Sequence, residues 1–229
     1  LAALDRAAAE MASYSASPRG RVRVALFPSG AALLLPGVFE RLLGSEILLD
    51  ASDEDVPASA VPVLLADYDV VLTHRDERAP ATAGPRIEVT ALMREPIDLV
   101  LPAGHRLAGQ DSVDVRQLAD ERWISVRGGF PVDDVLLSVA AATGVAPRVV
   151  QRINDFRVTE ELVARGHGVA LLPRYAVVHP SLVRLPLSGV RAGRIYELAT
   201  RPGARALPAV SAVIEAFRGE VAATATPLP

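Results

Sequence analysis

The sequence predicts an α/β fold in which two doubly wound, Rossmann-like lobes are joined by two crossing strands. Short apolar segments alternate with helix-like segments, a pattern typical of βαβ units and a parallel sheet. This alternation restarts after the middle of the chain. The 229 residues, 50% of them hydrophobic, provide enough chain for two lobes of about 100 residues, each with a core.

The first half contains three predicted strands and two predicted helices. The strand at 69–73 has an unbroken apolar interior, which is typical of a parallel strand buried on both faces. The predicted strands are 22–27, 47–50 and 69–73, and the predicted helices are 31–43 and 56–66.

A longer extended stretch, 87–101, crosses into the second half, and a strand at 194–200 returns to the first lobe. Between them the pattern predicts strands 123–126, 148–153, 169–172 and 183–187 and helices 131–143 and 158–165, and a last helix follows at 207–221. We therefore expect residues 20–96 plus 200–229 to form lobe I and 97–199 to form lobe II. Residues 1–19 are expected to be the end of a linker helix and a linker, since Leu1, Leu4, Ala8 and Met11 have coiled-coil spacing.

Composition excludes several kinds of chemistry. The chain has no Cys, and all 24 basic residues are Arg, so thiol, zinc-finger and lysine chemistry are excluded. The net charge of −3 lacks the excess of basic residues that is typical of a surface that binds nucleic acid. His74, His105, His167 and His179 lack ligand spacing, and 27–30 lacks the first Gly of a G-x-S-x-G elbow, so we expect no metal, no cofactor and no enzyme. The longest apolar stretch is too short for a membrane span, which favours the cytoplasm.

Several motifs occur in a recognisable order along the chain. They are GRVRVA at 20–25, DYDVVL at 67–72, REPIDLVLPAGHRLA at 94–108, LADERWI at 118–124 and LVARGHGVALLP at 162–173. Together they resemble the effector-binding domain of bacterial LysR-type transcriptional regulators over roughly residues 20–220. The resemblance implies a type 2 periplasmic-binding-protein-like clamshell that binds a small-molecule effector between its lobes.

The resemblance also implies partners. This domain would form a homodimer, commonly antiparallel, and the full-length protein a tetramer that binds DNA through a winged helix-turn-helix preceding this chain. Gly37, Val38, Leu42 and Leu43 of the first helix are then candidates for the dimer interface. The sequence departs from the family at 46–50, which lacks a preceding Pro, and at Pro28, and these departures affect the expected shape of the pocket.

Ligands of doubly wound sheets bind outside the carboxyl ends of the strands, which selects candidate residues in lobe I. Ser29 and Gly30 begin the first helix, where the resemblance places a ligand contact. Ser29 is also an apt N-cap, and the helix N-terminus favours an anion. Thr73 and His74 end a strand. A histidine of ordinary pKa there would donate to or accept from a polar ligand, or lie in a solvated charge cluster with 75–78.

In lobe II the candidates are Ser125, Val126, Arg127, Phe130, Asp155 and Phe156. Arg127 is suited to clamp a carboxylate and Phe130 to cover an apolar ligand face. Alternatively, 127–129 is only a turn with Arg127 in solvent, and Asn154 or Asp155 is only a helix N-cap.

We therefore expect an effector-sensing and oligomerising domain of a LysR-type regulator, with an anionic or aromatic effector, although neutral effectors also fit. The alternative is a stand-alone solute-binding protein of a transporter, which uses a similar clamshell. The helical pattern at the start of the chain favours the regulator.

Overall fold

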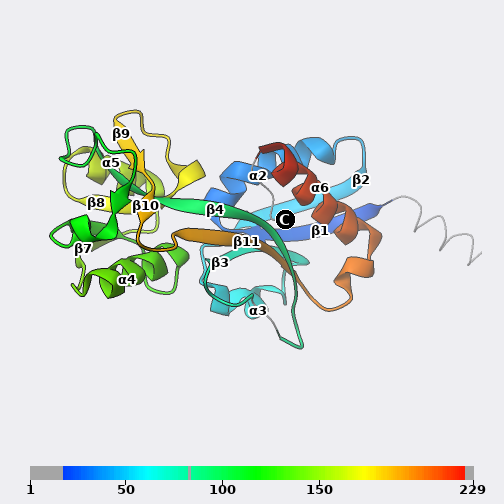
Figure 1. Ribbon diagram of the computed structural model, residues 1–229. Coiled ribbons are helices and arrows are strands. Elements are labelled where there is room, and N and C mark those ends of the chain that lie inside the picture. The colour runs from blue at the N-terminus through cyan, green and yellow to red at the C-terminus, as the bar shows by residue number, and fades with distance from the viewer. Residues whose placement is uncertain (1–17, 82–83, 225–229) are drawn as a thin grey trace, which may run out of the picture. The chain divides into compact units, whose positions relative to one another are not determined.

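The computed structural model describes residues 18–81 and 84–224 (Figure 1), so the helix expected at the start of the chain lies outside the described residues. The chain divides into two compact units. Unit 1 comprises Leu1–Thr73, Thr82–Met93 and Glu197–Pro229, as far as these are described, and unit 2 comprises His74–Ala81 and Arg94–Tyr196. The chain leaves unit 1 after Met93 and returns to it at Glu197, in each case three residues earlier than the expected boundary. Unlike the expectation, residues 74–81 belong to the second unit. There His74 lies 2.9 Å from a guanidinium nitrogen of Arg194, and Arg78 donates to the Asp134 carbonyl.

Unit 1 is built on parallel strands. Strand β1 lies between β2 and β3, with Arg19 opposite Glu46 and Val24 opposite Val70. Helices α2 and α6 lie on one face of this sheet and α3 on the other (Figure 1). The elements that lie in this unit or begin or end in it are β1 (Arg19–Leu26), α2 (Pro28–Arg41), β2 (Glu46–Asp53), η1 (Ala58–Ala60), α3 (Val61–Leu64), β3 (Val70–Asp76), β4 (Glu88–Pro102), β11 (Gly193–Thr200), η4 (Ala204–Ala206) and α6 (Pro208–Thr224).

The predicted helix at 56–66 is wrong in length. The structure has only a single 3-10 turn and the four-residue helix α3 there. Pro62 has no N–H to continue the preceding turn, and its fixed φ suits the first turn of a new helix. A proline inside the window therefore splits it.

Unit 2 contains a mixed sheet. Strand β6 pairs in parallel with β7 and β8, and β4 pairs antiparallel with β8 and β9. The predicted strand 183–187 is split at Pro186 into β9 and β10, and β10 pairs with β5 in a two-stranded sheet that the sequence did not predict. The remaining elements are β5 (Val113–Asp114), η2 (Val115–Leu118), β6 (Arg122–Ser125), α4 (Pro131–Thr143), β7 (Arg148–Arg152), α5 (Phe156–Ala164), β8 (Val169–Pro173), η3 (Arg174–Ala176), β9 (Leu182–Leu185) and β10 (Leu187–Ser188).

The sheet of unit 2 is buried on both faces. Along β4, Leu99 and Leu101 enter one apolar cluster and Val100 enters the other, as the two-residue period of a strand requires. Helix α4 supplies the first cluster and α5 the second. This arrangement confirms the predicted doubly wound α/β architecture. No helix in the described ranges is long and apolar enough to cross a membrane.

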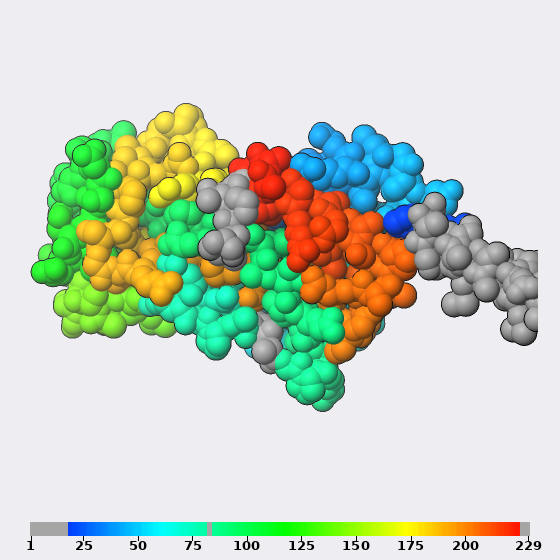
Figure 2. All heavy atoms as spheres, turned by 45° about the vertical axis from the view of Figure 1, so that its right-hand side comes forward, coloured from blue at the N-terminus to red at the C-terminus, as the bar shows by residue number. Residues whose placement is uncertain are grey.

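Helices α2 and α6 pack closely in unit 1, side by side in Figures 1 and 2. Gly37 makes this approach feasible, because a Cβ there would collide with the carboxylate of Glu220. Glu220 is itself buried and accepts a hydrogen bond of 3.0 Å from Nε of Arg41. A Cβ at Gly219 would lie 2.9 Å from the Arg41 guanidinium, so both glycines enclose this ion pair.

We expect Gly37→Ala to lower the free energy of unfolding by about 1–3 kcal/mol, as an overpacked site does. Helix propensity alone predicts the opposite sign, since Ala favours a helix over Gly by roughly 1 kcal/mol. Urea denaturation measures the change. In a Glu220→Ala background the collision is absent, so Gly37→Ala should become neutral or stabilising. Equal losses in both backgrounds would contradict this account of the packing.

Candidate functional site

The expectation that Ser29 caps α2 is wrong. The N-cap is Phe27, which makes no side-chain cap, and Pro28 takes the first helical position. Proline is suited to that position because its φ is already helical and it has no N–H to satisfy. The helix therefore starts earlier than expected, and Ser29 lies half-exposed in its first turn.

Gly30 and Thr73 are both buried in unit 1. A Cβ at Gly30 would collide with the ring of Phe27 and lie 2.9 Å from Cδ2 of Leu72, and the Gly30 N–H donates to the Phe27 carbonyl at 3.0 Å. Packing therefore explains the glycine without a ligand. Thr73 lies inside β3 and is the last residue of unit 1 before the chain enters unit 2.

His74 is not on a solvated loop, and its pKa is not the ordinary one expected from sequence. The residue is 6% exposed, and its ring meets Phe130 edge-on with centroids 6.3 Å apart. Burial first, and then the charge of Arg194, lower the pKa of His74 well below its usual value of 6.5. Nη1 of Arg194 lies 2.9 Å from Nδ1 of His74. Because arginine only donates, Nδ1 accepts and the proton is on Nε2.

A buried polar cluster fixes this histidine. Arg194 and Glu95 are 1% and 0% exposed and form an ion pair, with Nε of Arg194 2.8 Å from Oε2 of Glu95. Tyr196 accepts from Arg194 and donates to the same carboxylate oxygen, both at 2.8 Å. The second oxygen, Oε1, accepts from the Tyr175 N–H at 2.7 Å. Burial is the largest cause that raises the pKa of Tyr196 well above 10.0, so its hydroxyl remains protonated.

Sequence reasoning missed Glu95, Arg194 and Tyr196 as site residues. The signal was present, because the segments 94–101 and 193–200 combine apolar residues with five charged ones: Arg94, Glu95, Asp98, Arg194 and Glu197. A charge inside a strand buried on both faces is rare unless it is paired.

The segment 75–78 is also not the solvated charge cluster considered from sequence. Asp76 is buried and forms two 2.7 Å hydrogen bonds with the guanidinium of Arg78. Arg78 also donates to the Asp134 carbonyl at 3.0 Å and to the hydroxyl of Ser138. The end of β3 is thereby tied to α4 within unit 2.

The loop after β6 carries Arg127 and Phe130, and the Phe130 ring is 6% exposed and belongs to the apolar core of the unit. Ser125 and Val126 are buried; the Ser125 hydroxyl lies 3.4 Å from Asp133, and the Val126 carbonyl accepts from Arg152 at 2.7 Å. These contacts fix the loop. The guanidinium carbon of Arg127 lies 5.5 Å from the centroid of the Phe130 ring, and the residue itself is exposed.

Residues 154–156 mainly organise backbone. Asp155 is the N-cap of α5, accepting from the N–H of Arg157 at 2.8 Å and of Val158 at 3.3 Å, so its predicted capping role is confirmed. Asn154 instead accepts from the Arg127 N–H at 2.9 Å. Phe156 is half-buried and packs against both apolar clusters of the unit.

Within unit 2, the structure brings His74 and Arg127 to the same aromatic ring, that of Phe130. A neutral imidazole donor, a guanidinium and an aromatic surface together suit a planar ligand that carries an anionic or other acceptor group. Ser29, Gly30 and Thr73 belong to the other unit. Among the described residues, no group of three or more His, Asp or Glu is placed to hold a metal ion.

The depressed pKa of His74 predicts a pH dependence of stability. Below pH 6.5 the unfolded chain binds a proton on this residue and the folded chain does not, so the free energy of unfolding falls as the pH falls. The expected limit is about 1.4 kcal/mol per pH unit from this residue. Urea denaturation from pH 7.5 to 5.5 should show a weaker loss in His74→Gln than in the wild type. His167→Gln is the control, and an equal loss in all three proteins would refute the assignment.

Comparison with known proteins then identifies the family. Residues 15–222 match the LysR substrate binding domain family. The HTH-type transcriptional regulator CysL of Bacillus subtilis is 24% identical over 189 residues, which are 80% of this chain and 60% of CysL. The chain thus spans less than two thirds of the curated relatives' length.

Solved structures show the same fold. A reduced form of OxyR from N. meningitidis superposes with a TM-score of 0.75 at 21% identity, covering 92% of this chain and 100% of that one. The effector binding domain of QuiR in complex with shikimate gives a TM-score of 0.75 at 17% identity, covering 91% and 100%. The fold is thus the expected type 2 periplasmic-binding-protein-like fold. The relatives are regulators rather than enzymes or transporter components, and the chain belongs to the LysR family as its substrate-binding, effector-sensing domain.

Proposed function

We propose that this domain senses a small planar anion for a cytoplasmic, DNA-binding transcriptional regulator. The observation that carries the proposal is the convergence of His74 and Arg127 on the Phe130 ring in unit 2. In this proposal Ser125, Val126, Asp155 and Phe156 of the same unit complete the binding site. DNA would be bound by a helix-turn-helix module of the full-length protein.

The donor set favours an acceptor ligand. Nδ1 of His74 accepts from Arg194, so this ring has only an N–H to offer a ligand. Arg127 is permanently charged, and guanidinium groups bind carboxylates through paired hydrogen bonds. Phe130 supplies an apolar face. One structural neighbour, QuiR, is described with shikimate bound, and shikimate combines a ring with a carboxylate.

A thermal-shift screen of ring carboxylates against the neutral amides of the same acids tests this function. A ligand at about 100 times its Kd stabilises the folded state by about 2.7 kcal/mol, which corresponds to a rise in Tm of about 5–10 °C for a chain of this size. The rise should be lost in Arg127→Ala, because the anion then lacks its cation. Arg122→Ala, which removes an exposed arginine of the same loop-flanking strand, should retain it. Equal shifts for acids and amides would rule out anion sensing.

We also propose that the domain forms a homodimer, with tetramers in the full-length protein. Of the residues considered from sequence, Val38 is buried in the core and Gly37 packs on Glu220, so these two do not offer side chains to a partner. Leu42 is half-buried. Leu43 is 79% exposed, and Leu48 of the neighbouring strand is 63% exposed. Large exposed apolar side chains just after α2 and on β2 favour an interface around these two elements.

Leu43→Glu and Leu48→Glu should therefore shift the protein toward monomer, because each places a charge in the interface. Sedimentation velocity at micromolar concentration measures the change. Val63→Glu is the matched control, since Val63 is 73% exposed but lies on α3. An unchanged sedimentation coefficient in both leucine variants would reject this surface.

A further inference from the structure

Unit 2 contains a cavity of about 400 Å³, lined by both charged and apolar residues. Its charged lining consists of three arginines and two carboxylates: Arg94, Arg174, Arg191, Glu77 and Asp98. Its apolar lining is Pro96, Ile97, Pro186, Leu187, Val190 and Ala192. This volume and this mixture of walls are typical of small-molecule sites.

The charged residues that β4 contributes to the cavity lie on the opposite face of the strand from Glu95. Successive side chains of a strand point to opposite faces. Arg94, Pro96 and Asp98 line the cavity, whereas Glu95, between them, pairs with Arg194 behind His74. The two places are therefore chemically separate although they share one strand.

Each oxygen of the two carboxylates in the cavity already accepts a hydrogen bond from arginine. Nε and Nη2 of Arg94 donate to the two oxygens of Glu77 at 2.8 and 2.9 Å. Arg174 uses the same two nitrogens on the two oxygens of Asp98, both at 2.8 Å. Gly193 permits the first pair, since a Cβ there would lie 2.7 Å from Nη2 of Arg94. The pKa of Glu77 is lowered, chiefly by its hydrogen bond from Arg94, so this carboxylate stays ionised.

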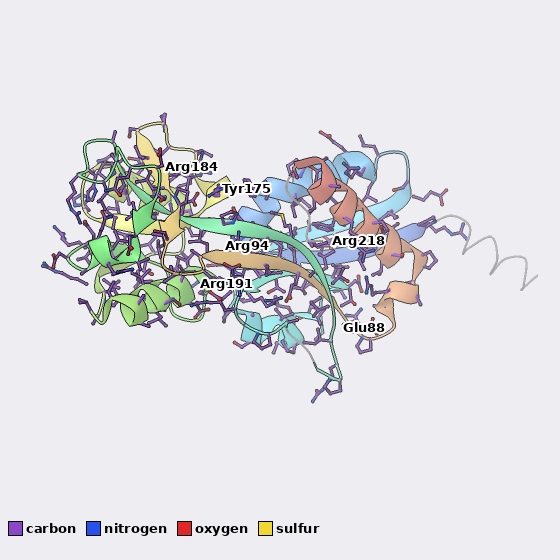
Figure 3. All side chains as sticks on the ribbon, viewed as in Figure 1. Glu88, Arg94, Tyr175, Arg184, Arg191 and Arg218 are labelled. Atoms are coloured by element: carbon purple, nitrogen blue, oxygen red, sulfur yellow. The ribbon has the colours of Figure 1, made fainter. Side chains whose placement is uncertain are left out.

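Donors remain after this pairing. In the described part of the chain, Nη1 of Arg94 and Nη1 of Arg174 donate to no residue, and Arg191 makes only one bond, of 3.3 Å, to Glu77. The Arg191 side chain is 69% exposed. Figure 3 labels it close to Arg94. Three cations face two anions, which leaves one positive charge and several unused N–H groups.

We propose that this cavity is a second ligand site, which binds a monoanionic carboxylate with a small apolar body. The carboxylate would accept from Arg191 and the remaining Nη1 groups, and the apolar body would contact Pro186, Leu187 and Val190. A cationic ligand is disfavoured, since every carboxylate oxygen in the cavity already accepts from a guanidinium. A neutral ligand would leave the excess positive charge of the three arginines uncompensated. This site is independent of the effector site proposed above.

Calorimetric titration with hexanoate and benzoate tests the proposal, in the whole 229-residue chain carrying Arg127→Ala to weaken the first site. Saturable binding is expected, and Arg191→Gln should weaken it by about tenfold or more, the effect of losing a charge-assisted hydrogen bond. Arg116→Gln is the control, because this arginine of the same unit is 78% exposed and lies outside the cavity. Its Kd should stay within about twofold of that of the parent.

Three results would overturn the proposal: no saturable binding, equal binding of hexan-1-ol and benzyl alcohol, or equal Kd values in Arg191→Gln and Arg116→Gln. Binding that is present in the wild type, absent in Arg127→Ala and unaffected by Arg191→Gln would place the carboxylate at the first site alone. That result would refute the second site and leave the proposed effector function standing.

Discussion

The ion pair between Arg194 and Glu95 is the interaction on which the rest of the site depends. Both residues are nearly inaccessible to water, and each lies on one of the two strands, β11 and β4, that pass from one unit into the other. Desolvating two charges is expensive, and removing one partner of such a pair costs about 3–5 kcal/mol. The pair therefore specifies the relative position of β4 and β11 in unit 2 and, through His74, the end of β3.

The same constraint determines the chemistry on both faces of β4. Because Arg194 is buried, its N–H groups need acceptors, and Nη1 donates to Nδ1 of His74. The imidazole is then neutral and carries its proton on Nε2. On the other face, Arg94 and Asp98 each need a partner of opposite charge and find Glu77 and Arg174. Charged residues at alternate positions of one buried strand thus generate two separate polar environments.

Much of this architecture could be predicted from sequence because it depends on hydrophobic periodicity. Helix α4 has the predicted bounds, 131–143, since Pro131 starts it and Gly144, at φ +70°, ends it. The site was harder to predict. The group that donates to Nδ1 of His74, and the residue on which Gly30 packs, Leu72, are both distant in sequence. Ser29 was wrongly predicted as the N-cap. The fixed φ of Pro28 favours the first helical position, so the helix starts one residue before Ser29.

A sensing domain must also prefer its ligand in one state, and this requirement bears on why two anion sites would share one strand. Moving a minor state from about 1% to 99% requires a difference in ligand affinity of roughly 5.5 kcal/mol between the states. A charge-assisted hydrogen bond contributes about 1.5–3 kcal/mol, so Arg127 alone falls short. Strands β4 and β11 each enter both units. The second site is lined by residues of β4, and His74 of the first site is hydrogen-bonded to Arg194 of β11. Carboxylates at both sites would act on the same two strands. Two such bonds contribute about 3–6 kcal/mol together, which reaches the required magnitude near the upper end of that range.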